Sequence, residues 1–238
     1  MQLLGDFAAR TQPQPLRRTR RRFTPCAVLH DTMAQPQQQR AVTTGLKEWA
    51  SVVSSVEAGE SSVLLRKGGI AEKGFKVQSR VFAFYPSGFH DAARFLTAAA
   101  VVAHGNSVGT TPGENALLTV LGECTAAWQT DDGPGALAAL AAFHPWNSEL
   151  LTTRLNWRPL DKLTIVEVRA YRLPAPYVLA GSPDHGGCKS WVEVEPVGAL
   201  DLQSAVPVMD DAAWALRQRD VRAALARVGN VTPIDVPL

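Results

Sequence analysis

The sequence is poor in cysteine, and it lacks the paired spacings that hold disulfides or metals. Its three cysteines, Cys26, Cys124 and Cys188, are scattered and odd in number, which favours a reducing compartment over a disulfide framework. The five histidines show no paired spacing, and neither CxxC nor HExxH occurs. The sequence therefore predicts no cofactor and no metal site. Because carboxylates are common, Mg²⁺ stays open as an alternative.

The chain also lacks a long apolar run. A membrane-spanning helix needs about 20 apolar residues in succession, and polar residues interrupt every candidate stretch of this sequence. The composition, 46% hydrophobic and 19% charged, is typical of an ordinary globular protein. A chain of this size buries roughly 70% of the surface that its unfolded form exposes, so it needs no covalent crosslink. We expect a soluble, cytoplasmic protein with no membrane partner.

Positive charge is concentrated at the amino terminus. Residues 1–40 hold seven arginines and two aspartates, a local net charge of +5, whereas the remaining residues carry a net charge of −3. The part of the chain that is expected to fold therefore has no global charge signature of a nucleic-acid-binding protein, although it can still carry a local basic patch.

Residues 1–40 show no sustained apolar period, contain four prolines and include the run RRTRRR. Three interpretations stay open. They are a basic arm that binds phosphates or anionic lipid, an Arg-rich targeting segment, and a disordered extension that results from a wrong upstream start. We favour the third interpretation, with Met33 as the true start.

Hydrophobic periodicity predicts alternating helices and strands after residue 40. Strands are expected where β-branched and aromatic residues recur or alternate: 63–66, 75–85, 117–128, 163–173 and 190–195. For 117–128 a helix is the alternative. Helices are expected where apolar residues recur at helical spacing: 45–58, 91–102, 135–144, 148–155 and 211–228. Pro174 and Pro176 are expected to end the fourth of these strands.

About five strands interrupted by helices, without regular βαβ alternation, indicate an α+β protein. We expect a mixed or antiparallel sheet, or a small open barrel, with helices packed across it and a C-terminal helix at the end. Residues 41–200 are expected to form one α+β domain, and residues 201–238 a linker and that helix. The sequence shows no internal repeat.

The stretch from residue 64 to residue 90 holds the densest local chemistry. Arg66 and Lys67 end an expected strand, and Gly68 and Gly69 follow, so two cations stand beside flexible backbone N–H groups. This arrangement suits an anionic ligand such as a phosphate or a carboxylate. It is not a Walker loop, because GxxxxGK[ST] is absent. A solvated glycine turn is the alternative interpretation.

Two histidines are candidates for acid–base chemistry. His90 stands at the amino end of an expected helix, where the helix dipole favours a neutral imidazole that can act as a general base. His144 closes an apolar helix, where the dipole favours the imidazolium form. If the two met in space, they would suit a base and an acid. The alternatives are a capping role for His90 and a His144 packed on Trp146.

Cys188 and Lys189 follow two glycines and open an expected strand. Lys189 is a further candidate for anion binding, and its charge would favour a nucleophilic thiolate at Cys188. A catalytic cysteine needs a histidine nearby, and only His185 is local. We favour a buried structural cysteine, since free cysteines are among the most buried residues.

Five pieces of the sequence carry a resemblance to a known family. They are GLKEWASVVSSVEAGE (45–60), LLRKGGIAE (64–72), FAFYPSGFH (82–90), FHPW (143–146) and GGCKSW (186–191). Over 46–191 the chain thereby resembles the bacterial and archaeal family catalogued as domain of unknown function 1802. The resemblance implies a family identity and no activity, since that family has no established one. It also supports Met33 as the start, because the family pattern begins near residue 46.

Four positions depart from the family pattern. The family usually has a Thr-like residue after YP, a Gln-like residue after the first histidine, and a later motif closer to HIWT. This chain has other residues there: Ser87, Asp91, Pro145 and Asn147. Both histidines are in place, but the roles of their neighbours do not carry over.

These observations lead to two hypotheses about function, and they leave open whether the protein is an enzyme. The first is a domain that binds or processes a phosphate-bearing ligand, either a nucleic acid or a nucleotide. Its anion ligands would be Arg66, Lys67, Gly68, Gly69 and Lys189, with His90 and His144 as acid–base candidates. The second is a non-enzymatic protein-interaction module. It would use the basic arm and the arginines of the C-terminal helix: Arg217, Arg219, Arg222 and Arg227.

Overall fold

The computed structural model describes residues 41–68, 72–88, 92–150, 153, 161–194 and 200–237. The chain divides into two units, 1–38 and 39–238, and everything below concerns the second. The expected disordered extension over 1–40 and the Met33 start lie outside the described residues, as do Gly69 and His90.

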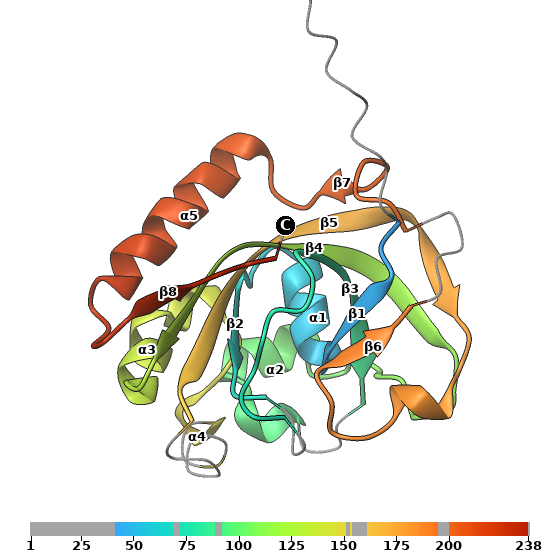
Figure 1. Cartoon of the computed structure of the whole chain (residues 1–238), viewed down its shortest axis with the longest axis horizontal. Helices are drawn as coiled ribbons and strands as arrows, with labels where there is room; N and C mark the ends of the chain where they lie inside the picture. The colour runs from blue at the N-terminus through green and yellow to red at the C-terminus, as the bar shows by residue number, and fades with distance from the viewer. Residues whose placement is uncertain are drawn as a thin grey trace, which may run out of the picture. The chain divides into compact units, whose positions relative to one another are not determined.

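One mixed sheet of eight strands organises this unit (Figure 1). The strands are β1 (Thr44–Trp49), β2 (Val63–Arg66), β3 (Val81–Ser87), β4 (Ala116–Thr130), β5 (Leu163–Leu179), β6 (Trp191–Glu193), β7 (Val206–Pro207) and β8 (Thr232–Ile234). Hydrogen-bonded neighbours follow the order β2-β5-β4-β3-β1-β6, with β7 joined to β5 and β8 joined to β4. β1 and β3 are parallel, and the other pairs are antiparallel.

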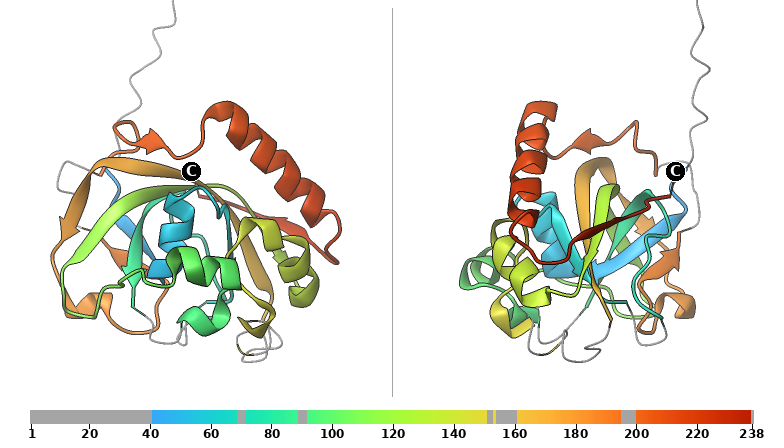
Figure 2. Two further views of the ribbon diagram at one scale, coloured as in Figure 1. Left: turned by 180° about the vertical axis from the view of Figure 1, so that it is seen from behind. Right: turned by 60° about the vertical axis from the view of Figure 1, so that its left-hand side comes forward.

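Five α-helices and three short 3₁₀ helices accompany the strands in the described residues. They are α1 (Ala50–Glu57), η1 (Ala92–Phe95), α2 (Ala98–His104), α3 (Gly133–Ala139), η2 (Ala141–Phe143), α4 (Ser148–Leu150), η4 (Pro183–His185) and α5 (Asp211–Leu225). α1 packs against α2, and α5 lies against α3 (Figure 2). No helix within the described ranges is long and apolar enough to cross a membrane.

The core lies on both faces of the sheet. Successive side chains of a strand point to opposite faces, and in β3 this places Phe82 and Phe84 in one buried cluster and Ala83 and Tyr85 in another. Trp191 joins the first cluster, where its ring stacks on Phe75 and meets Phe82 edge-on. Both faces of β3 are therefore buried. An unbroken apolar sequence such as that of β3 is typical of a strand enclosed on both faces.

The α+β class and the C-terminal helix are confirmed, whereas the expected number of about five strands is wrong. One added strand, β1, occupies residues for which helical spacing predicts the start of a helix. Gly45 explains the difference. A β-carbon at Gly45 would lie 2.9 Å from a methyl group of Val192, so the glycine lets β6 pair closely with β1. Pairing with two strands that are distant in sequence outweighs the local helical pattern.

The prediction that two prolines end the fourth expected strand is also wrong, because β5 continues through them to Leu179. The reason lies in its pairing with β4. Leu118 pairs with Tyr177 and Val120 pairs with Arg172, so the register shifts there, and Pro174 and Pro176 fall within the shift. Proline removes a backbone donor, and a bulge is a position in a sheet where that donor is not needed.

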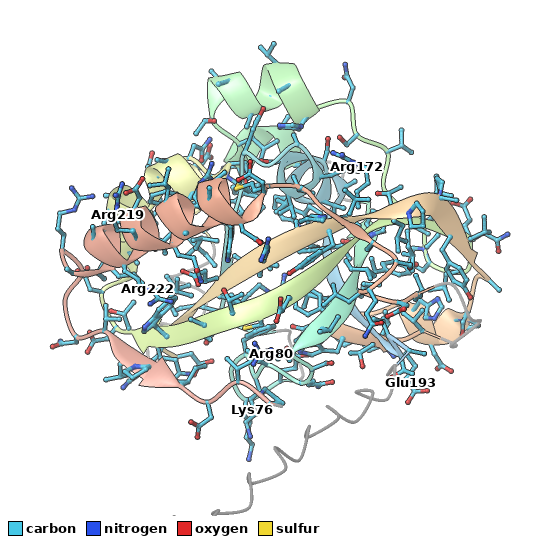
Figure 3. The ribbon with its side chains drawn as sticks, turned by 90° about the horizontal axis from the view of Figure 1, so that it is seen from above. Lys76, Arg80, Arg172, Glu193, Arg219 and Arg222 are labelled. Atoms are coloured by element: carbon cyan, nitrogen blue, oxygen red, sulfur yellow. The ribbon has the colours of Figure 1, made fainter. Side chains whose placement is uncertain are left out.

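α5 is held to the sheet by polar contacts around a buried carboxylate. Glu167 of β5 is fully buried, and its Oε1 accepts hydrogen bonds from Thr125 at 2.6 Å and from Gln218 at 2.9 Å. Arg222 lies on the side of α5 toward the sheet, with its Nη2 3.9 Å from the same oxygen (Figure 3). Arg217 donates to the carbonyl oxygen of Glu60 at 3.1 Å. The helix is thus part of the folded unit.

Candidate functional site

The site is built where β1 and β3 end. The two strands are parallel, with Glu48 opposite Pro86 and Trp49 opposite Ser87, so their carboxyl ends meet at one edge. Arg66, the last residue of β2, reaches the same edge. In the order of the sheet three strands separate β2 from β1, so only the strong curvature of the sheet brings Arg66 there (Figure 1).

Arg66 and Glu48 form a buried ion pair at this edge. Arg66 Nη1 donates to Glu48 Oε2 at 2.8 Å and to the Lys47 carbonyl at 3.2 Å, and the side chains are only 11% and 3% exposed. The guanidinium also lies 5.3 Å from the centre of the Phe75 ring. The charge of Arg66 is therefore balanced inside the protein, and Arg66 positions the edge of the site.

Lys47 lies between the ion pair and a loop from the far end of the chain. Its Nζ donates to the carbonyl oxygens of His185 at 2.8 Å and Gly187 at 2.9 Å. Burial lowers the pKa of Lys47, and the positive charges of Lys189 and Arg66 lower it further, while Cys188 opposes them. Lys47 thus lies close enough to two other cations to feel their positive charge.

Lys189 and Cys188 are exposed at the rim of this cluster. The interpretation of Cys188 as a buried structural cysteine is therefore wrong. Within the described part of the chain, no ion pair joins Lys47 or Lys189 to an acidic residue. Two positive charges consequently remain uncompensated, one half-buried and one exposed.

Glu72 connects the two loops that border the site. Its carboxylate accepts hydrogen bonds from the backbone N–H of Ser190 at 2.8 Å and from the Ser190 hydroxyl at 2.7 Å. Next along the chain, Trp191 Nε1 donates to the carbonyl of Lys76 at 2.9 Å. These contacts place the loop after Arg66 beside the segment that carries Lys189.

In the turn after β2, Gly68 is needed because a larger residue would clash with the backbone. Gly68 has a φ of +89°, and a β-carbon there would lie 2.7 Å from the carbonyl carbon of Gly74. The backbone at Gly68 therefore packs directly against the backbone at Gly74. Lys67, half-buried beside it, has a pKa lowered by burial and raised in part by Asp161. Gly68 therefore shapes the loop, and Lys67 lies within reach of an acidic side chain.

The two candidate acid–base histidines are not shown to meet, since His90 lies outside the described residues. His144 is buried. Its Nε2–H donates to the Leu137 carbonyl at 3.0 Å, and its Nδ1 accepts from the N–H of Trp146 at 3.2 Å. Burial lowers the pKa of His144 to about 4. The imidazole is neutral near pH 7, so the expectation of an imidazolium is wrong.

Sequence reasoning missed several residues of this edge. Lys47 and Glu48 fall in the segment for which a helix is predicted, and neither Glu72 nor Ser190 is among the predicted site residues. The signal that could have found them is their place in the pieces that carry the family resemblance, since Lys47, Glu48, Glu72 and Ser190 all lie in those pieces. Among the described residues, no cluster of histidine, cysteine and carboxylate side chains could hold a metal ion.

Comparison with known proteins identifies a family over most of the chain. A family model described as "Domain of unknown function (DUF1802)" matches residues 45–220, which include every residue of the edge discussed above. No curated protein and no solved structure matches the chain.

Replacing Arg66 with methionine should destabilise the protein by about 3–5 kcal/mol, because it leaves the Glu48 carboxylate buried without a partner. Removing both charges, in Arg66→Met with Glu48→Gln, should cost clearly less than the sum of the single changes. Urea unfolding of the wild type and the three variants measures this coupling. Additive losses would show that the pair is not coupled.

Gly68→Ala should lower the free energy of unfolding by about 1–3 kcal/mol more than Gly113→Ala does. Both glycines have positive φ, so both alanines strain the backbone, but nothing lies within 4 Å of a β-carbon at Gly113, whereas one at Gly68 meets Gly74. Chemical denaturation of the two variants isolates the clash. Equal losses would mean that the loop can open without cost.

His144 should make the protein less stable in mild acid. Its pKa is about 4 when folded and about 6.5 when unfolded, so unfolding takes up a proton between these values and stability falls as the pH drops through them. Between pH 7 and pH 5 this contributes a loss of about 2 kcal/mol, which His144→Gln should lack. Urea unfolding at both pH values measures the difference. An NMR titration of the His144 ring with a midpoint near 6.5 would contradict it.

Proposed function

This chain belongs to the DUF1802 family, and we propose that the edge where β1 and β3 end binds a phosphate-bearing ligand, either a nucleotide or a nucleic acid. The observation that carries this proposal is the pair of uncompensated cations, Lys47 and Lys189, beside the neutralised Arg66–Glu48 pair.

The charges of the site favour an anion. Holding a half-buried lysine beside other cations costs free energy, as the lowered pKa of Lys47 reflects. An anion bound among Lys47, Lys189 and Arg66 would offset this free-energy cost. Because Arg66 is already paired with Glu48, the remaining charge is about two, which matches a phosphate monoester at neutral pH better than a single carboxylate.

The donors of the site also suit phosphate oxygens. An ammonium group has three N–H donors, and Lys47 uses two of them on backbone carbonyls, so one is left for a ligand. Lys189 is exposed and makes no described ion pair, so its donors are accessible. Glu72 is turned toward Ser190 by two hydrogen bonds, which lessens its repulsion of an anion.

The proposal is limited to binding. His144 is buried and donates to a backbone carbonyl, so it is not placed to exchange a proton with a ligand. The site described above therefore supplies charge and hydrogen-bond donors without a described acid or base.

The structure offers less support for the second hypothesis, a protein-interaction module that uses the arginines of α5. Arg217 donates to the carbonyls of Gly59 and Glu60, and Arg222 lies near the buried Glu167. These two side chains hold the helix in place. Arg227, just beyond the helix, is exposed and provides a useful comparison.

A titration followed by tryptophan fluorescence tests the proposal, because Trp49 and Trp191 are the chain neighbours of Glu48 and Ser190. The ligands are pyrophosphate, ATP, and short RNA and DNA. Lys189→Ala should weaken binding about 10- to 100-fold, as expected for one hydrogen bond between charged groups, and added salt should weaken it in the wild type.

Arg227→Ala is the matched control, since it removes one exposed positive charge outside the site. It should leave pyrophosphate and ATP binding unchanged. If none of the ligands binds the folded protein, or if Arg227→Ala weakens binding as much as Lys189→Ala, the proposed site is wrong.

A further inference from the structure

A hydrogen-bonded chain of serine, histidine and glutamate joins α1 to α2 and includes none of the residues of the anion site. Ser54 Oγ lies 2.9 Å from His104 Nδ1, and His104 Nε2 lies 2.7 Å from Glu60 Oε2. We propose that Ser54 is a nucleophile for acyl transfer, that His104 is its general base, and that Glu60 positions the imidazole. The substrate class is an activated carboxylic ester.

The proton positions follow from the partners. A carboxylate only accepts hydrogen bonds, so His104 Nε2 carries the proton that is donated to Glu60. In the neutral ring Nδ1 is then an acceptor, and the hydroxyl of Ser54 donates to it. The hydroxyl proton thus points at a base that is free to take it, which is the arrangement that activates a serine.

The fold places His104 between the end of a helix and the carboxylate of Glu60. His104 is the last residue of α2, and the carboxyl end of a helix stabilises positive charge. Glu60 adds a negative charge on the other side of the ring. The side chain of His104 is only 6% exposed, so its orientation is fixed by packing.

The nucleophile can be reached from solvent. Ser54 is half-buried, and the side chain of Glu60 is 58% exposed. Ala58, which follows α1, and Gly105, which follows His104, are both exposed and small.

The chemistry is an acyl transfer in two steps. The Oγ of Ser54 attacks the ester carbonyl carbon while its proton moves to Nδ1 of His104, and the same proton then leaves with the alkoxide or phenoxide as the carbon–oxygen bond breaks. Water, deprotonated by His104, then attacks the acyl group, and the released Ser54 oxygen takes the proton back. Only water is consumed besides the ester.

The position of Ser54 inside a helix decides which esters can react. Backbone N–H groups within a helix are bonded to carbonyls one turn back, so the nucleophile has no oxyanion hole of its own backbone. A good leaving group lessens the need for such a hole. We therefore expect turnover of aryl esters such as p-nitrophenyl acetate, and not of amides.

The test is hydrolysis of p-nitrophenyl acetate by the full chain, together with mass-spectrometric mapping of the acetylated residue. Acetyl should be found on Ser54 of the wild-type protein. Ser54→Ala and His104→Gln should each lower the rate about 100-fold or more, the usual contribution of a nucleophile's general base. Ser107→Ala, at a half-buried serine just after α2, is the matched control and should keep the wild-type rate.

Glu60 needs a readout that a merely structural role would not change. Glu60→Gln should lower kcat and leave KM unchanged, because the imidazole is no longer held toward Ser54, and Glu60→Asp should restore part of kcat. Acetyl found only on lysines of the folded wild type, or an unchanged rate in folded Ser54→Ala, would overturn the proposal. Because the mapping uses the wild-type protein, it tests whether Ser54 is the nucleophile even if a variant fails to fold.

Discussion

The buried contact between Arg66 and Glu48 is the constraint on which this molecule depends. It joins β2 and β1, which are not hydrogen-bonded to each other and have three other strands between them in the sheet. A buried ion pair contributes little net stability, because its attraction is offset by the loss of hydration. The pair instead constrains the geometry of the sheet. Neither charge can be buried alone, so the sheet must curve until the two meet, and the loops that follow the strands are then gathered at one edge.

Much of the fold could be predicted because its signals are local. Alternation indicated β5, β-branched residues indicated β4, and α5 begins just after Asp210, whose side chain caps it. The misassigned segment was β1, because Leu46, Trp49 and Val52 fit helical spacing as well as they fit a short strand running into a helix. Only pairing with β3 and β6, far along the chain, decides between these states. The course of β5 through its prolines likewise depends on the register of its partner.

The residue types of the candidate site could be predicted from the sequence, but the contacts that those residues make with one another could not. Arg66, Lys67, Gly68 and Lys189 could be chosen because cations beside glycines suit anions. That Arg66 would be neutralised by Glu48, and that Lys47 would stand beside Lys189, are facts of tertiary structure. The same holds for His144, where burial outweighs the helix dipole that the sequence suggested, and for Ser54, Glu60 and His104, whose spacing in sequence gives no sign of contact.

The anion site is made from pieces that are far apart in the order of synthesis. Lys47 contacts a carbonyl 140 residues later in the chain, and Glu72 contacts Ser190 after a separation of 118 residues. During translation Glu72 therefore lacks its contact with Ser190, and Lys47 lacks its two carbonyls, until the segment around residue 190 has left the ribosome. A nascent chain that stops earlier holds β1 to β5 without a complete site, so binding competence can arise only late in synthesis, when most of the sheet already exists.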